Sequence, residues 1–178
     1  DASAEKLTIV GVASKALTVT GGGSDDTILG SADTAAGDTL KGGAGDDTFT
    51  FGEGDLTYLD TIDGGAGTDT IKAVIDVSDV DFMNVTNVET LTIDEDGDVS
   101  TNVLGAYFNS TGITKVNLDP TNVSTISAPG TSGNITYVQT GALNDVITAG
   151  LGDDTFSYSG TTLLTNADTI DGGAGTDT

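Results

Sequence analysis

The residues of this chain most suited to chemistry are aspartates that follow glycine-rich stretches. The pattern Gly-Gly-x-Gly-x-Asp-x-apolar-x occurs at residues 42–50 and 64–72, and with Ala in first place at residues 149–157. A fourth copy begins at Gly172 and is cut off at Thr178. Glycines permit positive φ, so such a turn can direct several carbonyl oxygens at one point while the Asp adds a carboxylate. Ca²⁺ prefers oxygen ligands of these two kinds.

Weaker copies precede the strong ones and keep an Asp before an apolar residue, and a degenerate copy lies at residues 21–29. Two nonapeptides would form one coil, and stacking would place Asp residues of neighbouring coils about 4.8 Å apart. Several Ca²⁺ ions between such turns would hold the coils together, so we expect folding to be coupled to calcium. The predicted metal ligands are Asp26, Asp38, Gly43, Gly45, Asp47, Asp60, Asp63, Gly65, Gly67, Asp69, Asp145, Gly150, Gly152, Asp154, Asp168, Asp171, Gly173, Gly175 and Asp177.

Two single aspartates and one acidic turn have two interpretations each. Asp63 and Asp171 directly precede a Gly-Gly pair, and are either additional ligands or solvated surface residues. The spacing Asp94-x-Asp96-x-Asp98 is similar to the start of an EF-hand loop, but the twelfth position is Gly105 rather than Glu. A solvated acidic turn is therefore favoured there over a separate calcium site.

The composition excludes several classes of function. The formal net charge is −23, with 28 acidic residues against five lysines, which argues against nucleic acid and anionic membranes as partners. No apolar stretch is long enough for membrane insertion. Cys and His are absent, which removes zinc sites, thiol nucleophiles and imidazole bases, so we expect no enzymatic activity in these residues. Disorder is the alternative for so acidic a chain, but its evenly spaced apolar runs favour strands.

The elements that must position the aspartates are short strands. Apolar residues alternate with Thr, Asn or Lys in runs such as residues 88–93 and 113–118, which is the pattern of a half-buried strand. We predict an all-β fold, a right-handed parallel β-solenoid whose calcium blocks are joined by a metal-poor segment. A helical turn is predicted within residues 77–85.

Four segments are expected along the chain. Residues 1–20 would be incoming solenoid strands, 21–72 a first calcium block, 73–139 a metal-poor strand segment and 140–178 a second calcium block. An antiparallel sandwich is the alternative for the third, but a continuing coil would cover the open sheet edges of the flanking blocks. Residues 46–70 resemble residues 153–178, so the chain is expected to be part of a longer tandem array.

The Gly-Gly-Ala-Gly-Asp-Asp-Thr-Phe and Asp-Gly-Gly-Ala-Gly-Thr-Asp-Thr segments resemble the calcium-binding β-roll of RTX (repeats-in-toxin) proteins. With the Val-Glu-Thr-Leu-Thr-Ile run, the alternation is similar to RTX-type bacterial surface-layer proteins and large RTX adhesins or filaments. The resemblance implies an extracellular or cell-surface location after type I secretion, and self-assembly with copies of itself. Attachment to cell-surface polysaccharide would belong to other parts of the full protein.

The resemblance does not fix an activity, because RTX repeats accompany toxins, proteases, lipases and lattice proteins. The first hypothesis is a structural module of a surface layer or surface fibre, favoured by the tandem period. The second is an adhesin repeat, or the calcium-folded region of a secreted toxin or hydrolase whose active domain lies elsewhere. Ice binding by outward Thr ladders is weaker, because Thr-x-Thr pairs do not recur regularly.

Overall fold

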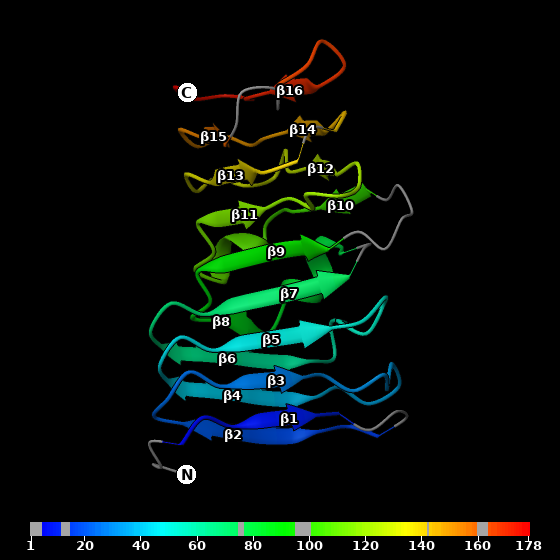
Figure 1. Cartoon of the computed structure of the whole chain (residues 1–178), viewed down its shortest axis with the longest axis vertical. Coiled ribbons are helices and arrows are strands. Elements are labelled where there is room, and N and C mark those ends of the chain that lie inside the picture. Colours follow the sequence, from blue (N-terminus) through cyan, green and yellow to red (C-terminus); the bar gives the residue numbers. More distant parts are fainter. Residues whose placement is uncertain (1–4, 12–14, 75–76, 95–100, 142, 160–163) are drawn as a thin grey trace.

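The chain forms a parallel β-solenoid, in which short strands stack as rungs along one long axis (Figure 1). Strands β1 and β2 lie at one end of the stack, and β15 and β16 lie at the other. The prediction of an all-β parallel solenoid is confirmed. The computed structural model describes residues 5–11, 15–74, 77–94, 101–141, 143–159 and 164–178.

One face of the solenoid is an eight-stranded sheet that runs its whole length, with every neighbouring pair parallel. Its strands are the odd-numbered ones, and each pairs with the odd-numbered strands before and after it. Their bounds are β1 Thr8–Val10, β3 Thr27–Leu29, β5 Thr48–Phe51, β7 Thr70–Val74, β9 Thr90–Asp94, β11 Lys115–Asn117, β13 Thr136–Gln139 and β15 Thr155–Tyr158.

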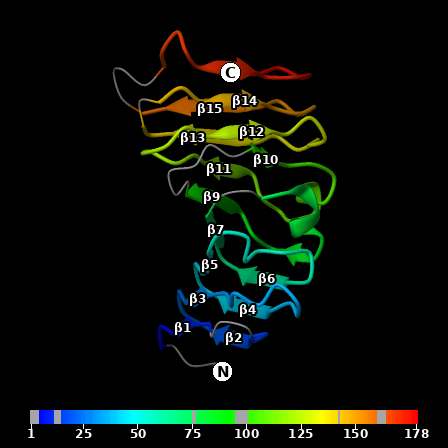
Figure 2. The same ribbon diagram turned by 90° about the vertical axis from the view of Figure 1, so that its right-hand side faces the viewer.

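The other face consists of two four-stranded parallel sheets (Figure 2). The first is ordered β2-β4-β6-β8 and the second β10-β12-β14-β16. Each coil therefore contributes one strand to the long sheet and one to a short sheet. The bounds are β2 Thr18–Gly22, β4 Thr39–Ala44, β6 Thr61–Ala66, β8 Val85–Thr86, β10 Thr101–Val103, β12 Thr125–Ser127, β14 Val146–Thr148 and β16 Thr169–Asp171.

The register places an apolar residue inward in most strands, and β5, β7 and β9 each place two. In the long sheet Ile28 pairs with Phe49, and Phe49 pairs with Ile71, and all three are fully buried. The flanking Thr residues point to the outer face, because successive side chains of a strand alternate between its two faces. The Thr-apolar-Thr triplets of the sequence therefore specify both the strands and a thin core.

Coils are longer than the 18 residues of two nonapeptides. Thr8 pairs with Thr27, 19 residues further on, and Thr90 pairs with Lys115, 25 residues further on. The additional residues lie in loops that join the two faces, such as the turns between β5 and β6. Residues 52–59 between β5 and β6 form such a loop.

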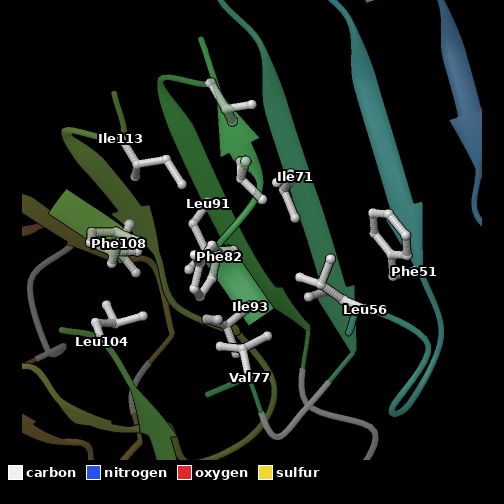
Figure 3. Close-up of a cluster of buried hydrophobic side chains, with 14 of the residues drawn as sticks. Phe51, Leu56, Ile71, Val77, Phe82, Leu91, Ile93, Leu104, Phe108 and Ile113 are labelled. Atoms are coloured by element: carbon white, nitrogen blue, oxygen red, sulfur yellow. The ribbon is translucent and has the colours of Figure 1, made fainter. Parts of the chain in front are cut away.

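The middle of the solenoid has a thicker core than its ends. Two 3-10 helices, η1 Asp79–Phe82 and η2 Phe108–Ser110, place the rings of Phe82 and Phe108 edge to face with centroids 5.2 Å apart. Leu91, Ile93 and Leu104 surround this pair (Figure 3). The helical turn predicted within residues 77–85 is confirmed. The antiparallel alternative is wrong, because β9, β11 and β13 pair in parallel.

Candidate metal centre

The turns between the two faces define two edges of the solenoid. The glycine edge consists of the turns that lead from a short sheet back to the long sheet, and in the lower part of Figure 1 they lie on the left. The opposite edge consists of the turns that leave the long sheet. Predicted ligands on the glycine edge are Asp26, Asp47, Asp69, Asp154 and Asp177, and those on the opposite edge are Asp38, Asp60, Asp145 and Asp168.

On the glycine edge each Asp accepts a backbone hydrogen bond from the preceding coil. The Asp26 N–H donates to Asp47 Oδ1 at 2.7 Å, and the Asp47 N–H donates to Asp69 Oδ1 at 2.8 Å. At the next coil Glu89 takes the place of Asp and accepts the Asp69 N–H at 2.7 Å. One oxygen of each carboxylate is thus part of a ladder that joins successive coils.

The second oxygen of three of these carboxylates has no protein donor. Asp26, Asp47 and Asp69 are at most 2% exposed, and their Oδ2 atoms form no hydrogen bond within the described part of the chain. Burial raises the pKa of the Asp47 carboxyl, and it raises the pKa of Asp69 from 3.8 to about 6. The neighbouring Asp26 and Asp47 carboxylates add to the two shifts, respectively. A buried carboxylate without donors is costly, so this row favours a bound cation.

The first glycine of each turn leaves room for that unpartnered oxygen. A β-carbon on Gly42 would lie 2.1 Å from Asp47 Oδ2 and 2.5 Å from the carbonyl oxygen of Gly64. A β-carbon on Gly21 would lie 2.1 Å from Asp26 Oδ2 and 2.4 Å from the Gly42 carbonyl oxygen. Beside Gly21 and Gly42, therefore, the aspartate oxygen of the same turn converges with a main-chain oxygen of the next coil.

The next glycines of these turns adopt the left-handed backbone that the sequence predicts. Their φ angles are 116° at Gly43, 124° at Gly45, 108° at Gly65 and 146° at Gly67, which L side chains rarely adopt. The predicted carbonyl ligands therefore lie in turns of the predicted conformation, on the same edge as Asp47 and Asp69. Their role as ligands stays a prediction.

The turn that ends at Asp154 differs from the others. Ala149 stands in first place, and Asp154 Oδ2 accepts the Gly150 N–H at 3.3 Å. Positive φ is found at Gly173 and Gly175 but not at Gly150 or Gly152. The four sequence copies are thus not structurally equivalent.

The cut-off fourth copy returns to the geometry of the first block. A β-carbon on Gly172 would lie 2.4 Å from Asp177 Oδ2, and Asp177 Oδ1 accepts the Asp154 N–H at 2.9 Å. Glycine thus stands in first place in the turns of Asp26, Asp47, Asp69 and Asp177, whereas alanine stands there in the turn of Asp154, whose second oxygen accepts a hydrogen bond.

On the opposite edge both oxygens of each Asp accept hydrogen bonds. Asp60 Oδ1 accepts the Asp38 N–H, and Asp60 Oδ2 accepts the Thr57 N–H, each at 2.7 Å. Asp38 and Asp168 are satisfied in the same manner by the loop before them, and Asp145 is satisfied by the Gln139 side chain of β13. These four predicted ligands are thus brought into a row, but a row that the protein itself completes.

Asp63 and Asp171, which the sequence left as either ligands or surface residues, lie on the outer faces of the solenoid. Asp63 accepts a hydrogen bond from Asn87 Nδ2 at 2.8 Å, and the exposed Asp171 accepts the Gly173 N–H at 3.0 Å. Asp94 forms an ion pair with Lys72 at 2.6 Å, whereas the rest of the acidic turn, residues 95–100, lies outside the described residues.

Sequence reasoning missed a second row of aspartates on the glycine edge. The Asp46 N–H donates to Asp25 Oδ1, and the Thr68 N–H donates to Asp46 Oδ1, both at 2.8 Å. In the C-terminal part Asp153 accepts the Thr176 N–H in the same way. The Asp-Asp pairs of the repeats could have indicated this second row, since both aspartates of a pair accept hydrogen bonds from neighbouring coils.

Side chains alone would not hold a metal ion on this edge, but side-chain and main-chain oxygens together fit calcium. Among residues that the structure describes, no three acidic side chains gather closely enough to hold a metal. Main-chain oxygens would have to complete the coordination, as the convergence beside Gly21 and Gly42 allows. Hard oxygen donors of mixed type suit Ca²⁺ better than softer metals.

The fold and this edge together define a β-roll with oxygen-rich turns. A profile of the RTX calcium-binding nonapeptide repeat matches four times, at residues 20–55, 57–73, 131–160 and 165–178, which is more than half of the chain. The chain belongs to this RTX calcium-binding repeat family. Searches of curated proteins and of solved structures found no match.

Proposed function

We propose that this chain is a calcium-folded structural module of an extracellular assembly, either a surface layer or a surface fibre. The observation that carries this proposal is the row of unpartnered carboxylate oxygens at Asp26, Asp47 and Asp69. Bound calcium would supply the positive charge that this row and a net charge of −23 lack. The module would then be stable where calcium is abundant, and unstable where it is scarce.

An extracellular location is consistent with that dependence and with the repeat family, which is typical of secreted proteins. Within the described residues, none of the helices has the length and apolar content to span a membrane. A solenoid also suits a structural role, because each coil contacts only its neighbours and the stack can extend without limit.

A second candidate is an adhesin repeat, or the calcium-folded region of a secreted toxin or hydrolase. The non-equivalent central coils, with the aromatic pair Phe82 and Phe108, favour it over a perfectly regular filament. We expect no catalysis by these residues themselves, because the sequence has neither His nor Cys.

Electron microscopy and analytical ultracentrifugation of the chain with calcium and with chelator test the assembly. The structural proposal predicts sheets or fibres in calcium that disperse in chelator. A calcium-loaded chain that stays monomeric at high concentration would contradict self-assembly, and would favour the adhesin or passenger role. Sodium at matched ionic strength is the control for general charge screening.

A further inference from the structure

We propose that the chain binds calcium along its glycine edge only, and that the aspartate row of the opposite edge is a metal-independent part of the fold. The inference rests on the calcium-dependent function proposed above, and it specifies which carboxylates serve it. The sequence alone assigns both rows to the metal, because both place an Asp directly before a strand.

The two rows begin with the same structural role. Asp47 Oδ1 accepts the Asp26 N–H and Asp60 Oδ1 accepts the Asp38 N–H, each at 2.7 Å. Asp47 is 1% exposed and Asp60 is 2% exposed. Burial raises the pKa of both carboxyls. The rows can therefore be distinguished only by the surroundings of the second oxygen.

On the opposite edge that oxygen is occupied by donors from the loop before it. The Thr57 N–H lies 2.7 Å from Asp60 Oδ2, and the Thr57 hydroxyl lies 3.2 Å from it. At Asp38 the Ser31 N–H donates to Oδ2 and the Ser31 hydroxyl donates to Oδ1, both at 2.7 Å.

The C-terminal half of the chain repeats this arrangement. Asp168 Oδ2 accepts the Thr165 N–H at 2.5 Å, and Asp145 Oδ2 accepts a hydrogen bond from the Gln139 side-chain amide. Three loops and the last residue of β13, all of different sequence, thus direct donors at the same carboxylate position.

These donors disfavour a cation for two reasons. Each N–H or O–H points its positive end at the oxygen that a cation would have to approach. A bound ion would also displace the donors and leave buried polar groups unsatisfied, which costs more than a hydrogen bond normally contributes. The Gly-Gly-x-Gly motif also does not occur in the residues just before Asp38, Asp60, Asp145 or Asp168.

On the glycine edge the second oxygen has the reverse surroundings. Within the described residues no donor reaches Asp47 Oδ2, and the carbonyl oxygen of Gly64 approaches the same point beside Gly42. Two partial or full negative charges facing each other are unfavourable without a cation and favourable with one.

The test compares Asp47→Asn with Asp60→Asn as a matched pair, by equilibrium dialysis of the folded chain at saturating ⁴⁵Ca²⁺. Asn can accept the ladder N–H in either position, but it removes the negative charge. We expect Asp47→Asn to bind at least one ion fewer than the wild-type chain. We expect Asp60→Asn to bind the wild-type number of ions while melting at a lower temperature, because its amide group faces the Thr57 N–H.

A folded Asp60→Asn chain that binds fewer ions than the wild-type chain would overturn the inference. If that variant does not fold, crystals of the calcium-loaded wild-type chain decide the question through calcium anomalous scattering. Peaks are expected only in the turns of the glycine edge, whereas a peak at Asp38 or Asp60 would overturn the proposal. A wild-type chain that binds no calcium would instead contradict the function on which the inference rests.

Discussion

Each row aspartate has two oxygens with separate tasks. The first oxygen joins coils by accepting a backbone N–H, as Asp69 does from Asp47 at 2.8 Å. The second is either satisfied by the protein, as at Asp60, or left to converge with a carbonyl oxygen, as at Asp47. By the inference above, the same residue type at the same position of a coil would serve hydrogen bonding or metal binding, depending on a loop of a few residues.

Gly42→Ala tests the space beside Asp47. The new β-carbon would lie 2.1 Å from Asp47 Oδ2 and 2.5 Å from the Gly64 carbonyl oxygen, so the two oxygens must separate. We expect the calcium affinity of the chain to fall at least tenfold, about 1.4 kcal/mol, in a fluorescence or calorimetric titration. Gly133→Ala is the control, because a β-carbon there meets no atom within 4 Å. Equal affinities of the two variants would contradict this account of the turn.

The acid response of the calcium-free chain follows from the raised pKa values. The pKa of the Asp69 carboxyl is raised by burial to about 6, and the pKa of Asp60 is raised by burial as well. The folded chain then binds more protons than the unfolded one between pH 4 and 6, so its stability is lost as pH rises through that window.

In chelator, we therefore expect the circular-dichroism signal of β-structure to be stronger at pH 4.5 than at pH 7. In saturating calcium the order should reverse, because protons compete with the metal for the carboxylates. A calcium-free chain that becomes less stable on acidification would show that the buried carboxylates are not destabilising.

The loop before each aspartate carries a signal that separates the two edges. Thr57-x-x-Asp60 and Thr165-x-x-Asp168 place a Thr N–H on the carboxylate, whereas the glycine turns place Gly five residues before Asp47 and Asp69. The strands, the inward apolar positions and the glycine turns could be predicted, because they depend on local periodicity and backbone freedom. The satisfied second oxygens could not, because they depend on how a loop of irregular length folds back.

At the scale of elements, the central coils replace glycine turns by apolar packing. Asp63 of β6 pairs with Thr86 of β8, but Asp69 follows Asp63 by six residues, whereas Glu89 follows Thr86 by only three. In these central coils Phe82, Phe108 and Leu104 fill the interior (Figure 3). This core comes from two 3-10 helices, of which the sequence pattern indicated only the first.

Phe82→Ala should destabilise these coils without changing the number of bound calcium ions. Phe82 is fully buried and packs edge to face on Phe108, so its truncation should cost about 3–5 kcal/mol of unfolding free energy. Val80→Ala on the same helix is the control, since Val80 is 44% exposed and its loss should cost less than about 0.5 kcal/mol. Denaturant titration in saturating calcium measures the stability of both variants. Similar midpoints would contradict the claim that this core stabilises the central coils.

At the scale of the whole molecule, charge opposes the fold that the strands favour. The chain carries a net charge of −23, and among described residues Lys72 and Asp94 form the one ion pair. Coil stacking brings further carboxylates together on the glycine edge, including the outward row of Asp25 and Asp46. A net charge of this size opposes a compact state, and we expect bound cations to offset it. The long sheet and the central core supply the apolar contacts that favour the fold.

A calcium titration followed by far-ultraviolet circular dichroism tests this central claim most directly. The account predicts weak β-structure in excess chelator and a cooperative gain of β-structure as calcium is added, which magnesium at the same concentration does not reproduce. An unchanged β spectrum in excess chelator at neutral pH would contradict it, because the solenoid would then tolerate its unpartnered carboxylates without a metal.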